Sequence, residues 1–132
     1  MNMENTGSIP SVSSDTSALP AIDDGHLEGL EKGSAALLVR SGPQRNERFI
    51  LSGQQITLGR SDESNIVLDD VTVSRVHALI TKGSSGWKIE DKGSLNGVYV
   101  NFVRIEDSKL SAGDDVQIGK YRFTFLLPEQ KI

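Results

Sequence analysis

A spaced set of polar residues and glycines is the part of this sequence best suited to chemistry. In chain order the groups are Gly59-Arg60, Ser74-Arg75-Val76-His77, Gly93-Ser94-Leu95-Asn96-Gly97 and Asn101. Each group falls where the hydrophobic pattern predicts the end of a strand, and the loops at one end of a β-sandwich lie together. Side chains from three separate connections can therefore converge on one concave patch. Such a patch would be a binding site without a catalytic base.

Catalytic alternatives have less support in the sequence. His77, Ser74 and Asp91 could form a hydrolase triad, but the chain has no Gly-x-Ser-x-Gly nucleophile elbow. Phosphate-loop and dinucleotide-binding glycine motifs are also missing. The chain has no cysteine, and the acidic pairs Asp69-Asp70 and Asp114-Asp115 are typical of solvated turns. We therefore expect no enzyme activity, no cofactor and no metal site.

The elements that must position the polar groups are β-strands. From Ala35 onward, apolar residues alternate with polar ones, which is the pattern of a strand with one buried face. Short turn segments separate these runs, and Asn96-Gly97 predicts a type I′ turn, which requires a positive φ at both central residues. About ten short strands and no convincing helix indicate an all-β fold, an antiparallel β-sandwich.

The net charge of −4 is divided unevenly along the chain. Residues 1–34 hold six acids and one base, whereas residues 35–132 hold 12 acids and 13 bases. The first 20 residues include seven Ser or Thr and two prolines, and they cannot bury enough apolar surface to offset their ordering entropy. Residues 25–30 have leucines at helical spacing, but two glycines favour a linker or a loosely docked segment. We predict a disordered, acidic, Ser/Thr-rich regulatory tail over 1–34 and one domain over 35–132.

The sequence also bears on where the protein works. Its first residues contain no basic region followed by an apolar run, and no stretch approaches the 18 or so apolar residues that a membrane span needs. The missing cysteines agree with a reducing compartment. We expect a cytoplasmic protein that binds neither membrane nor nucleic acid.

Together, the motifs resemble the forkhead-associated (FHA) domain, a β-sandwich that binds phosphothreonine peptides through its loops. The resemblance covers about residues 35–127 and rests on Gly-Arg, Ser-x-x-His and Asn-Gly in this order. It implies that the phosphopeptide is bound by Arg60, Ser74, Arg75 and Asn96. The residues expected to give structural support are Gly59, His77, Gly97 and Asn101.

The chemistry of these residue types suits that ligand. A phosphothreonine presents three acceptor oxygens and a charge of roughly −1.5 to −2. Arg60 offers a planar fork of donors that can bind two of those oxygens, which a lysine ammonium cannot reproduce. The hydroxyl of Ser74 can donate to a third oxygen, and Arg75 can add charge or a backbone donor. The amide of Asn96 can bind the peptide main chain in an extended direction.

A narrower resemblance is to the actinobacterial oxoglutarate dehydrogenase inhibitor and glycogen accumulation regulator family. It rests on Leu68–Arg75, Gly93–Gly97 and Val116–Lys120, and on a Ser/Thr-rich tail before a single FHA domain. Many FHA domains have Thr or Ser before the Asn-Gly, where this chain has Leu95. The resemblance implies that the chain modulates 2-oxoglutarate dehydrogenase, glutamate dehydrogenase and glutamate synthase.

The same resemblance implies a switch in the tail. A Ser/Thr kinase phosphorylates a tail threonine, which then binds the protein's own FHA site and turns regulation off. Thr16 is our candidate, with Asp15 beside it and Leu19 three residues later. A flexible span of 19 residues to Ala35 has a root-mean-square length of about 24 Å, which would permit the fold-back. The alternative is an inert, solubilising tail.

Two other functions remain open from the sequence. The chain could be a generic phosphothreonine-dependent adaptor in Ser/Thr kinase signalling, whose ligands are other phosphoproteins. It could also be a structural β-sandwich that binds no phosphate.

Overall fold

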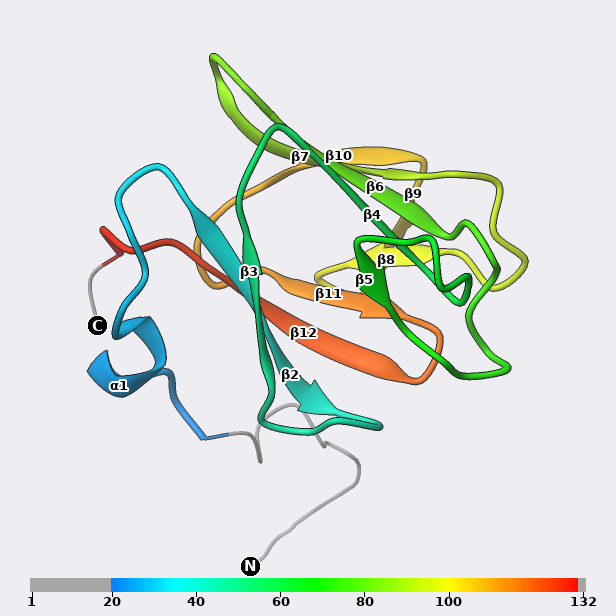
Figure 1. Ribbon diagram of the computed structural model, residues 1–132, viewed down its shortest axis with the longest axis horizontal. Coiled ribbons are helices and arrows are strands. Elements are labelled where there is room, and N and C mark those ends of the chain that lie inside the picture. Colours follow the sequence, from blue (N-terminus) through cyan, green and yellow to red (C-terminus); the bar gives the residue numbers. More distant parts are fainter. Residues whose placement is uncertain (1–19, 131–132) are drawn as a thin grey trace, which may run out of the picture.

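Two β-sheets pack face to face in the computed structural model, which describes residues 20–130 (Figure 1). The predicted switch residue, Thr16, lies outside this range. In sheet order, the five-stranded sheet contains β10 (Asp107–Leu110), β7 (Gly86–Asp91), β6 (Ala78–Gly83), β4 (Gln55–Gly59) and β5 (Ile66–Val67). The six-stranded sheet contains β3 (Arg48–Leu51), β2 (Ala35–Ser41), β12 (Tyr121–Leu126), β11 (Asp115–Ile118), β8 (Val98–Val100) and β9 (Val103–Ile105).

The predicted all-β sandwich is confirmed. Every strand pair is antiparallel except β4 and β5, where Leu58 lies opposite Ile66 in a parallel pair. The described residues contain one helix, α1 (Asp24–Leu27), and no helix in this range is long and apolar enough to cross a membrane.

The core lies between the two sheets and follows the predicted alternation. Tyr121, Phe123 and Phe125 of β12 all point inward and are almost completely buried. Trp87 of β7 reaches across from the other sheet, with its ring 6.2 Å from that of Phe125 in an edge-to-face arrangement. These contacts fix the two sheets relative to each other. The loops at the ends of the strands therefore begin from fixed positions.

Residues 20–34 pack on the sandwich, and we call this segment the strap (Figure 1). The predicted disorder over residues 1–34 is therefore wrong for residues 20–34, and so is the predicted linker or loose docking over residues 25–30. Leu30 is only 9% exposed and packs with Leu38 and Leu126 on the outer face of the six-stranded sheet. Asp23 caps the N-terminus of α1 through a capping box that it shares with His26. Gly29 lies after the helix with a φ of 77°, so it does not weaken the helix interior.

The predicted type I′ turn at Asn96-Gly97 is wrong. Gly97 has a φ of 86°, but Asn96 has no positive φ. A hydrogen bond within this loop, from the Gly97 amide to the Ser94 hydroxyl at 2.9 Å, shapes it instead. The tight turn with two positive φ values is Asn101-Phe102, at 50° and 70°, between β8 and β9.

Candidate functional site

The loops at one end of the sandwich bring the predicted phosphopeptide residues together. Arg60 follows β4, Ser74 and Arg75 precede β6, and Asn96 precedes β8. The Leu95 amide of the third loop donates to the Ser74 hydroxyl of the second at 3.0 Å. Residues that lie 21 positions apart therefore form one surface.

Arg60 is anchored at its base and open at its tip. Its Nε donates to the carbonyl of Val73 at 3.0 Å, and its backbone amide donates to the carbonyl of Ser74 at 2.9 Å. Within the described residues, its two terminal nitrogens donate to no protein group. Arg60 and Arg75 are both exposed and line one hollow of about 360 Å³. The anchoring aims a guanidinium fork at the surface without using the nitrogens that would bind an anion.

Ser74 is held in the same way. Its hydroxyl oxygen accepts the Leu95 amide, and its own amide donates to Nδ1 of His77 at 3.0 Å. The hydroxyl hydrogen is still available to a ligand because the oxygen acts here as an acceptor. Leu95 itself is 84% exposed, so its contribution to the loop is its backbone donor.

Asn96 connects the third loop to the second through its side chain. Its Nδ2 donates to the carbonyl of Thr72 at 2.8 Å, and its side-chain oxygen accepts from no protein group among residues 20–130. A neighbouring hollow of about 390 Å³ is bounded by Thr72, Asn96, Tyr99, Gln117, Gly119 and Lys120. Asn96 therefore lines a second depression, distinct from the hollow of Arg60 and Arg75.

His77 is a buried brace rather than a ligand-contacting residue. It is 0% exposed, and its Nδ1 accepts the Ser74 amide while its Nε2 donates to the carbonyl of Gly97 at 2.8 Å. This pattern requires the neutral imidazole with its hydrogen on Nε2. Both ring nitrogens are occupied by main-chain groups, so the Ser74, His77 and Asp91 set does not form a catalytic relay.

Two glycines allow close approaches behind these loops. A Cβ on Gly59 would lie 2.1 Å from the carbonyl oxygen of Arg75. A Cβ on Gly97 would lie 2.7 Å from Nε of Arg104. Their sequence-based role as structural support is consistent with this crowding.

Asn101 lies beyond the opposite end of β8 from Asn96 and does not join the recognition surface. Its Nδ2 donates to Asp114 at 3.1 Å, and its Oδ1 accepts the amide of Asp115 at 2.9 Å. It therefore braces the β8–β9 turn against the start of β11, and its support of the site is indirect.

The structure adds Asp70, Thr72 and Lys120 to the site, and no sequence motif marks them as functional. Thr72 donates to the Asp70 carboxylate through both its amide and its hydroxyl, and its hydroxyl accepts the Lys120 amide at 2.9 Å. The Asp-x-Thr spacing, typical of an Asx turn, was the available signal. No sequence signal indicates the contact between Thr72 and Lys120, because these residues are 48 positions apart.

These bonds also change the titration of the loop. The Thr72 hydroxyl and amide, and more weakly the charge of Lys120, lower the pKa of Asp70 below its ordinary value. Burial, followed by the charges of Asp70 and Asp69, raises the pKa of Tyr121. Asp70 is therefore held as a carboxylate, the form that can accept both bonds from Thr72.

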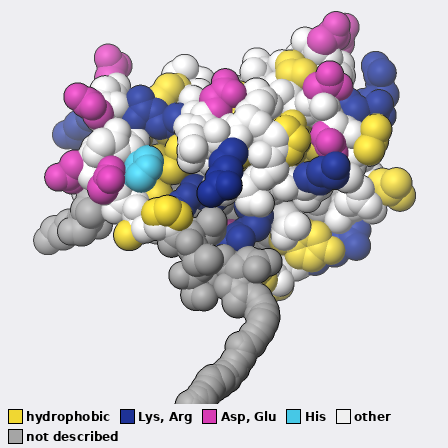
Figure 2. All heavy atoms as spheres, turned by 90° about the horizontal axis from the view of Figure 1, so that it is seen from below, with side chains coloured by type: hydrophobic (Ala, Val, Ile, Leu, Met, Phe, Trp, Pro, Cys, Tyr) yellow, Lys and Arg dark blue, Asp and Glu magenta, His cyan; other side chains and the backbone are white. Residues whose placement is uncertain are grey.

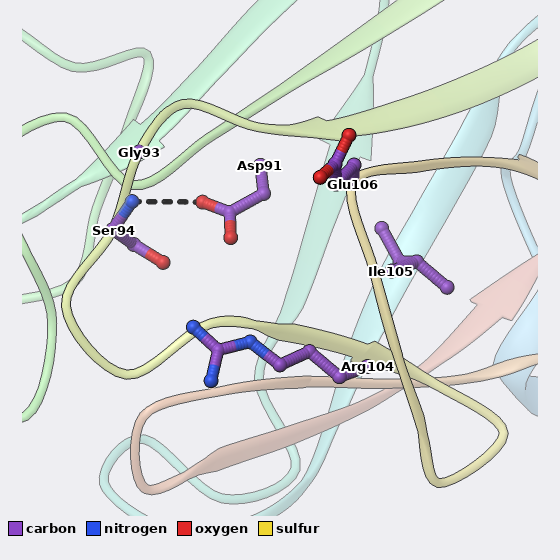
Figure 3. A pocket seen from close by; sticks show the side chains of 6 residues that line it. All are labelled: Asp91, Gly93, Ser94, Arg104, Ile105 and Glu106. Carbon is purple, nitrogen blue, oxygen red and sulfur yellow. Dashed lines mark hydrogen bonds between the residues drawn. The ribbon is translucent and has the colours of Figure 1, made fainter.

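A further hollow, of about 580 Å³, lies beside the loop that carries Gly93 and Ser94 (Figure 3). Arg104 reaches toward this loop, but the carboxylates of Asp91 and Glu106 line the same space. Asp91 accepts the Ser94 amide at 2.8 Å and so has a structural task. This hollow sets two carboxylates against one arginine, whereas the hollow at Arg60 sets two arginines against the carboxylates of Asp62 and Asp69. The hollow at Arg60 is therefore the better suited of the two to a phosphate. No group of three His, Cys, Asp or Glu residues in the described part of the chain could hold a metal ion.

Comparisons with known proteins agree with this geometry. The FHA domain family matches residues 56–119. The oxoglutarate dehydrogenase inhibitor of Corynebacterium jeikeium is 48% identical over 100 residues, which are 76% of this chain and 69% of that protein. The glycogen accumulation regulator GarA of Mycolicibacterium smegmatis is 47% identical over 100 residues, also 76% of this chain but 63% of that protein. The chain thus spans about two thirds of the length of these relatives.

Solved structures show the same fold. Mycobacterium tuberculosis EmbR in complex with a low-affinity phosphopeptide has a TM-score of 0.68 at 31% identity, covering 75% of this chain and 26% of that one. The FHA domain of the CT664 protein from Chlamydia trachomatis has a TM-score of 0.66 at 35% identity, covering 71% of this chain and 97% of that one. The chain therefore belongs to the FHA-domain family, in the group that contains the oxoglutarate dehydrogenase inhibitors and glycogen accumulation regulators.

Proposed function

We propose that this chain is a regulator without enzymatic activity that binds phosphothreonine peptides through Arg60, Ser74, Arg75 and Asn96. The observation that carries the proposal is the way these loops are built. Arg60, Ser74 and Asn96 each use one polar group to fix their position and keep another directed outward. Such preorganisation lowers the entropy that binding would otherwise cost.

The ligand follows from the arrangement of these groups. The terminal nitrogens of Arg60 and the hydroxyl of Ser74 would bind phosphate oxygens, while Arg75 adds positive charge at the same hollow. The side-chain oxygen of Asn96 would accept a main-chain amide of the peptide. The peptide would then continue over the depression beside Asn96, which ends at Lys120. EmbR, a structural neighbour, was solved with a phosphopeptide, and this supports the assignment of ligand class.

The test is a titration of the full chain with a phosphothreonine peptide and its unphosphorylated form. We expect a clear preference for the phosphopeptide and, for Arg60→Ala, an affinity at least about 100-fold lower, because charge-assisted hydrogen bonds contribute about 1.5–3 kcal/mol each. Arg45→Ala is the matched control, since this exposed arginine lies in the β2–β3 connection. Equal binding of both peptides would mean that the chain is a structural β-sandwich that does not recognise phosphate.

We further propose that the partners are enzymes of 2-oxoglutarate and glutamate metabolism. The names of the relatives, an oxoglutarate dehydrogenase inhibitor and a glycogen accumulation regulator, support this assignment. Affinity capture from a cytoplasmic extract with the unmodified chain should recover 2-oxoglutarate dehydrogenase, glutamate dehydrogenase or glutamate synthase. Recovery of unrelated phosphoproteins alone would instead identify a generic adaptor of kinase signalling.

The proposed regulation uses the acidic segment 1–34, with Thr16 as the residue that a Ser/Thr kinase modifies. Phosphorylated Thr16 would compete for the loops that bind partners, which turns the regulator off. Kinase treatment of the wild type and of Thr16→Ala should give different capture of partner enzymes. Equal capture after treatment would support the inert tail.

A further inference from the structure

The connection between β8 and β9 carries an aromatic side chain where a turn of its kind favours glycine. It consists of Asn101 and Phe102, with φ values of 50° and 70°. Two-residue hairpin turns with a positive φ at both positions prefer Asn-Gly, because a bulky side chain is strained in this region. Asn101 meets this preference and Phe102 does not. Among residues 20–130, Phe102 is the one apolar side chain on a backbone with positive φ.

Hydrogen bonds and an ion pair hold this turn in place. The Asn101 amide donates to the carbonyl of Asp115 at 2.7 Å, and the Asp115 amide donates to Oδ1 of Asn101 at 2.9 Å. The carboxylate of Asp115 accepts two hydrogen bonds from Arg122, at 2.6 and 3.0 Å. The Arg122 guanidinium in turn lies 5.3 Å from the centre of the Phe102 ring. The ring therefore rests on a braced ion pair and has a defined position.

Packing inside the protein does not account for the ring. Phe102 is 55% exposed, the next residue, Val103, is 62% exposed, and neither belongs to the core. A glycine would remove the backbone strain and lose only a cation–π contact, which is weak at an exposed site. Strained conformations of this kind cluster at binding sites and active sites. Phe102 and Val103, which we call the apolar tip, therefore point to a binding role.

The exposed apolar side chains of the protein are grouped rather than scattered. Single exposed apolar residues are ordinary, whereas a group of them marks an interaction surface. In Figure 2, hydrophobic side chains lie beside Lys and Arg side chains at the end of the molecule away from the exposed histidine. Seven large apolar side chains are exposed in the described range, and only Ile50 lies away from both the recognition loops and the apolar tip. The four in or beside the recognition loops are Val67, Val71, Val76 and Leu95.

The apolar tip and the recognition loops are close enough for one partner to cover both. Six residue steps separate Asn96 from Phe102, which is at most about 22 Å of extended chain. An interface of standard size covers about 800 Å² of each protein, or about 32 Å across. Arg104 follows the apolar tip, and its side chain reaches back toward the loop of Gly93 and Ser94 (Figure 3). It therefore bridges the surface between the two contacts.

The charges around the apolar tip indicate the kind of partner. The carboxylates that brace the turn, Asp114 and Asp115, are occupied by hydrogen bonds within the protein. Arg104 is exposed and forms no ion pair with any described residue, while Glu106 lies beyond the far end of β9. Two copies of this chain that met tip to tip would bring like charges of Arg104 and Arg122 together. The charges thus favour a different protein, with carboxylates around an apolar pocket.

We propose that the apolar tip is a second contact surface for the partner protein, where it inserts into an apolar pocket rimmed by carboxylates. This inference rests on the proposed function, in which the partner is an enzyme of 2-oxoglutarate metabolism, and adds a contact that needs no phosphate. A short phosphopeptide occupies the recognition loops alone. The apolar tip therefore acts only on the folded partner, and its role can be measured separately from peptide binding.

The experiment measures binding of the full chain to immobilised, purified 2-oxoglutarate dehydrogenase by surface plasmon resonance. Phe102→Gly and Phe102→Asn remove the ring and keep the turn, because both residues accept a positive φ. Phe102→Tyr keeps the ring. Ile50→Ala is the matched control for loss of one exposed apolar side chain, since Ile50 lies in β3 at the opposite edge of the same sheet. Each chain is also tested for phosphothreonine-peptide binding and for urea unfolding.

Phe102→Gly and Phe102→Asn should bind the enzyme about 10- to 30-fold more weakly than the wild type, as expected for loss of a central aromatic contact. Their peptide affinity should be unchanged, and their urea midpoints should be equal to the wild-type value or higher because the strain is relieved. Phe102→Tyr and Ile50→Ala should bind the enzyme like the wild type. Arg104→Gln should weaken enzyme binding about 3-fold and reduce its salt dependence.

Four results would overturn the inference. Equal enzyme binding by the wild type and Phe102→Gly would mean that the apolar tip makes no contact, and tighter binding by Arg104→Gln would contradict the carboxylate rim. A lower urea midpoint with weaker peptide binding in Phe102→Gly would make the ring a structural brace. Self-association of the wild type that Phe102→Gly abolishes would identify a second copy as the occupant.

Failure of the proposed function gives a different pattern. If the wild type binds the phosphopeptide but not the enzyme, the partner assignment and the contact at the apolar tip are rejected together. If the wild type binds the enzyme but shows no preference for the phosphopeptide, the phosphate site is rejected, and the comparison of Phe102→Gly with the wild type still tests the apolar tip.

Discussion

At the residue scale, the candidate site is formed by side chains that use one polar group in a hydrogen bond to the protein and leave another available to a ligand. Arg60 uses Nε, Ser74 uses its oxygen as an acceptor and Asn96 uses its Nδ2, each within the protein. The donors and acceptors that remain are those that a phosphate and a peptide main chain require. A side chain fixed in this way loses little conformational freedom when it binds.

Asp70 offers a test at the same scale. Its lowered pKa means that the folded state favours the carboxylate, so its contribution to stability is full above the ordinary pKa of about 3.9 and is lost as the pH falls through the lower folded value. Asp70→Asn should lower the urea midpoint at pH 7, and the difference from the wild type should shrink toward pH 2.

Asp69→Asn is the control for this measurement, because the neighbouring exposed carboxylate accepts no hydrogen bond among the described residues. It should shift the urea midpoint little at either pH. A difference between Asp70→Asn and the wild type that is the same at both pH values would show that the charge of Asp70 does not stabilise the loop.

At the element scale, the loops are positioned by one another as much as by their strands. The Arg60 amide donates to the Ser74 carbonyl, and the Ser61 amide donates to the Arg75 carbonyl at 3.2 Å. The imidazole of His77 then joins the second loop to the third. Displacement of one loop should therefore disturb the other two.

Gly59→Ala tests this dependence. The added Cβ would lie 2.1 Å from the Arg75 carbonyl, so the loop with Ser74 must move. We expect destabilisation of about 1–3 kcal/mol in urea unfolding, together with weaker phosphopeptide binding. Gly83→Ala is the matched control, because its Cβ would have no neighbour closer than 4.0 Å. Normal binding by a folded Gly59→Ala chain would contradict the mutual positioning.

At the scale of the whole molecule, the recognition surface and the strap lie at different places on one rigid sandwich. The loops gather at one end of the strands, and the strap covers Ala36, Leu38 and Leu126 on the outside of the six-stranded sheet. Binding and docking are therefore expected to be separable in the unphosphorylated chain.

Leu30→Ala tests this separation. Removing a buried leucine should lower the free energy of unfolding by about 2 kcal/mol, at the low end for core leucines because the cluster is small. Phosphopeptide affinity of the unphosphorylated chain should stay unchanged. For stability, Leu95→Ala is the control, since that leucine is 84% exposed and its loss should change the free energy by less than about 0.5 kcal/mol. Weaker peptide binding by folded Leu30→Ala would contradict the separation.

The sequence by itself determined the sandwich, its core and the residue types of the candidate site. These features are local: alternation marks a buried strand face, and Arg60, Ser74 and Asn96 stand in short motifs that resemble those of the FHA domain. Only the tertiary structure decided that Asn101 braces a distant turn, that Thr72 meets Lys120, and that residues 20–34 are docked. Each of these depends on partners far away in the sequence, such as Arg48 for the carbonyl of His26. A local pattern cannot specify such contacts, because they exist only once the two sheets have packed.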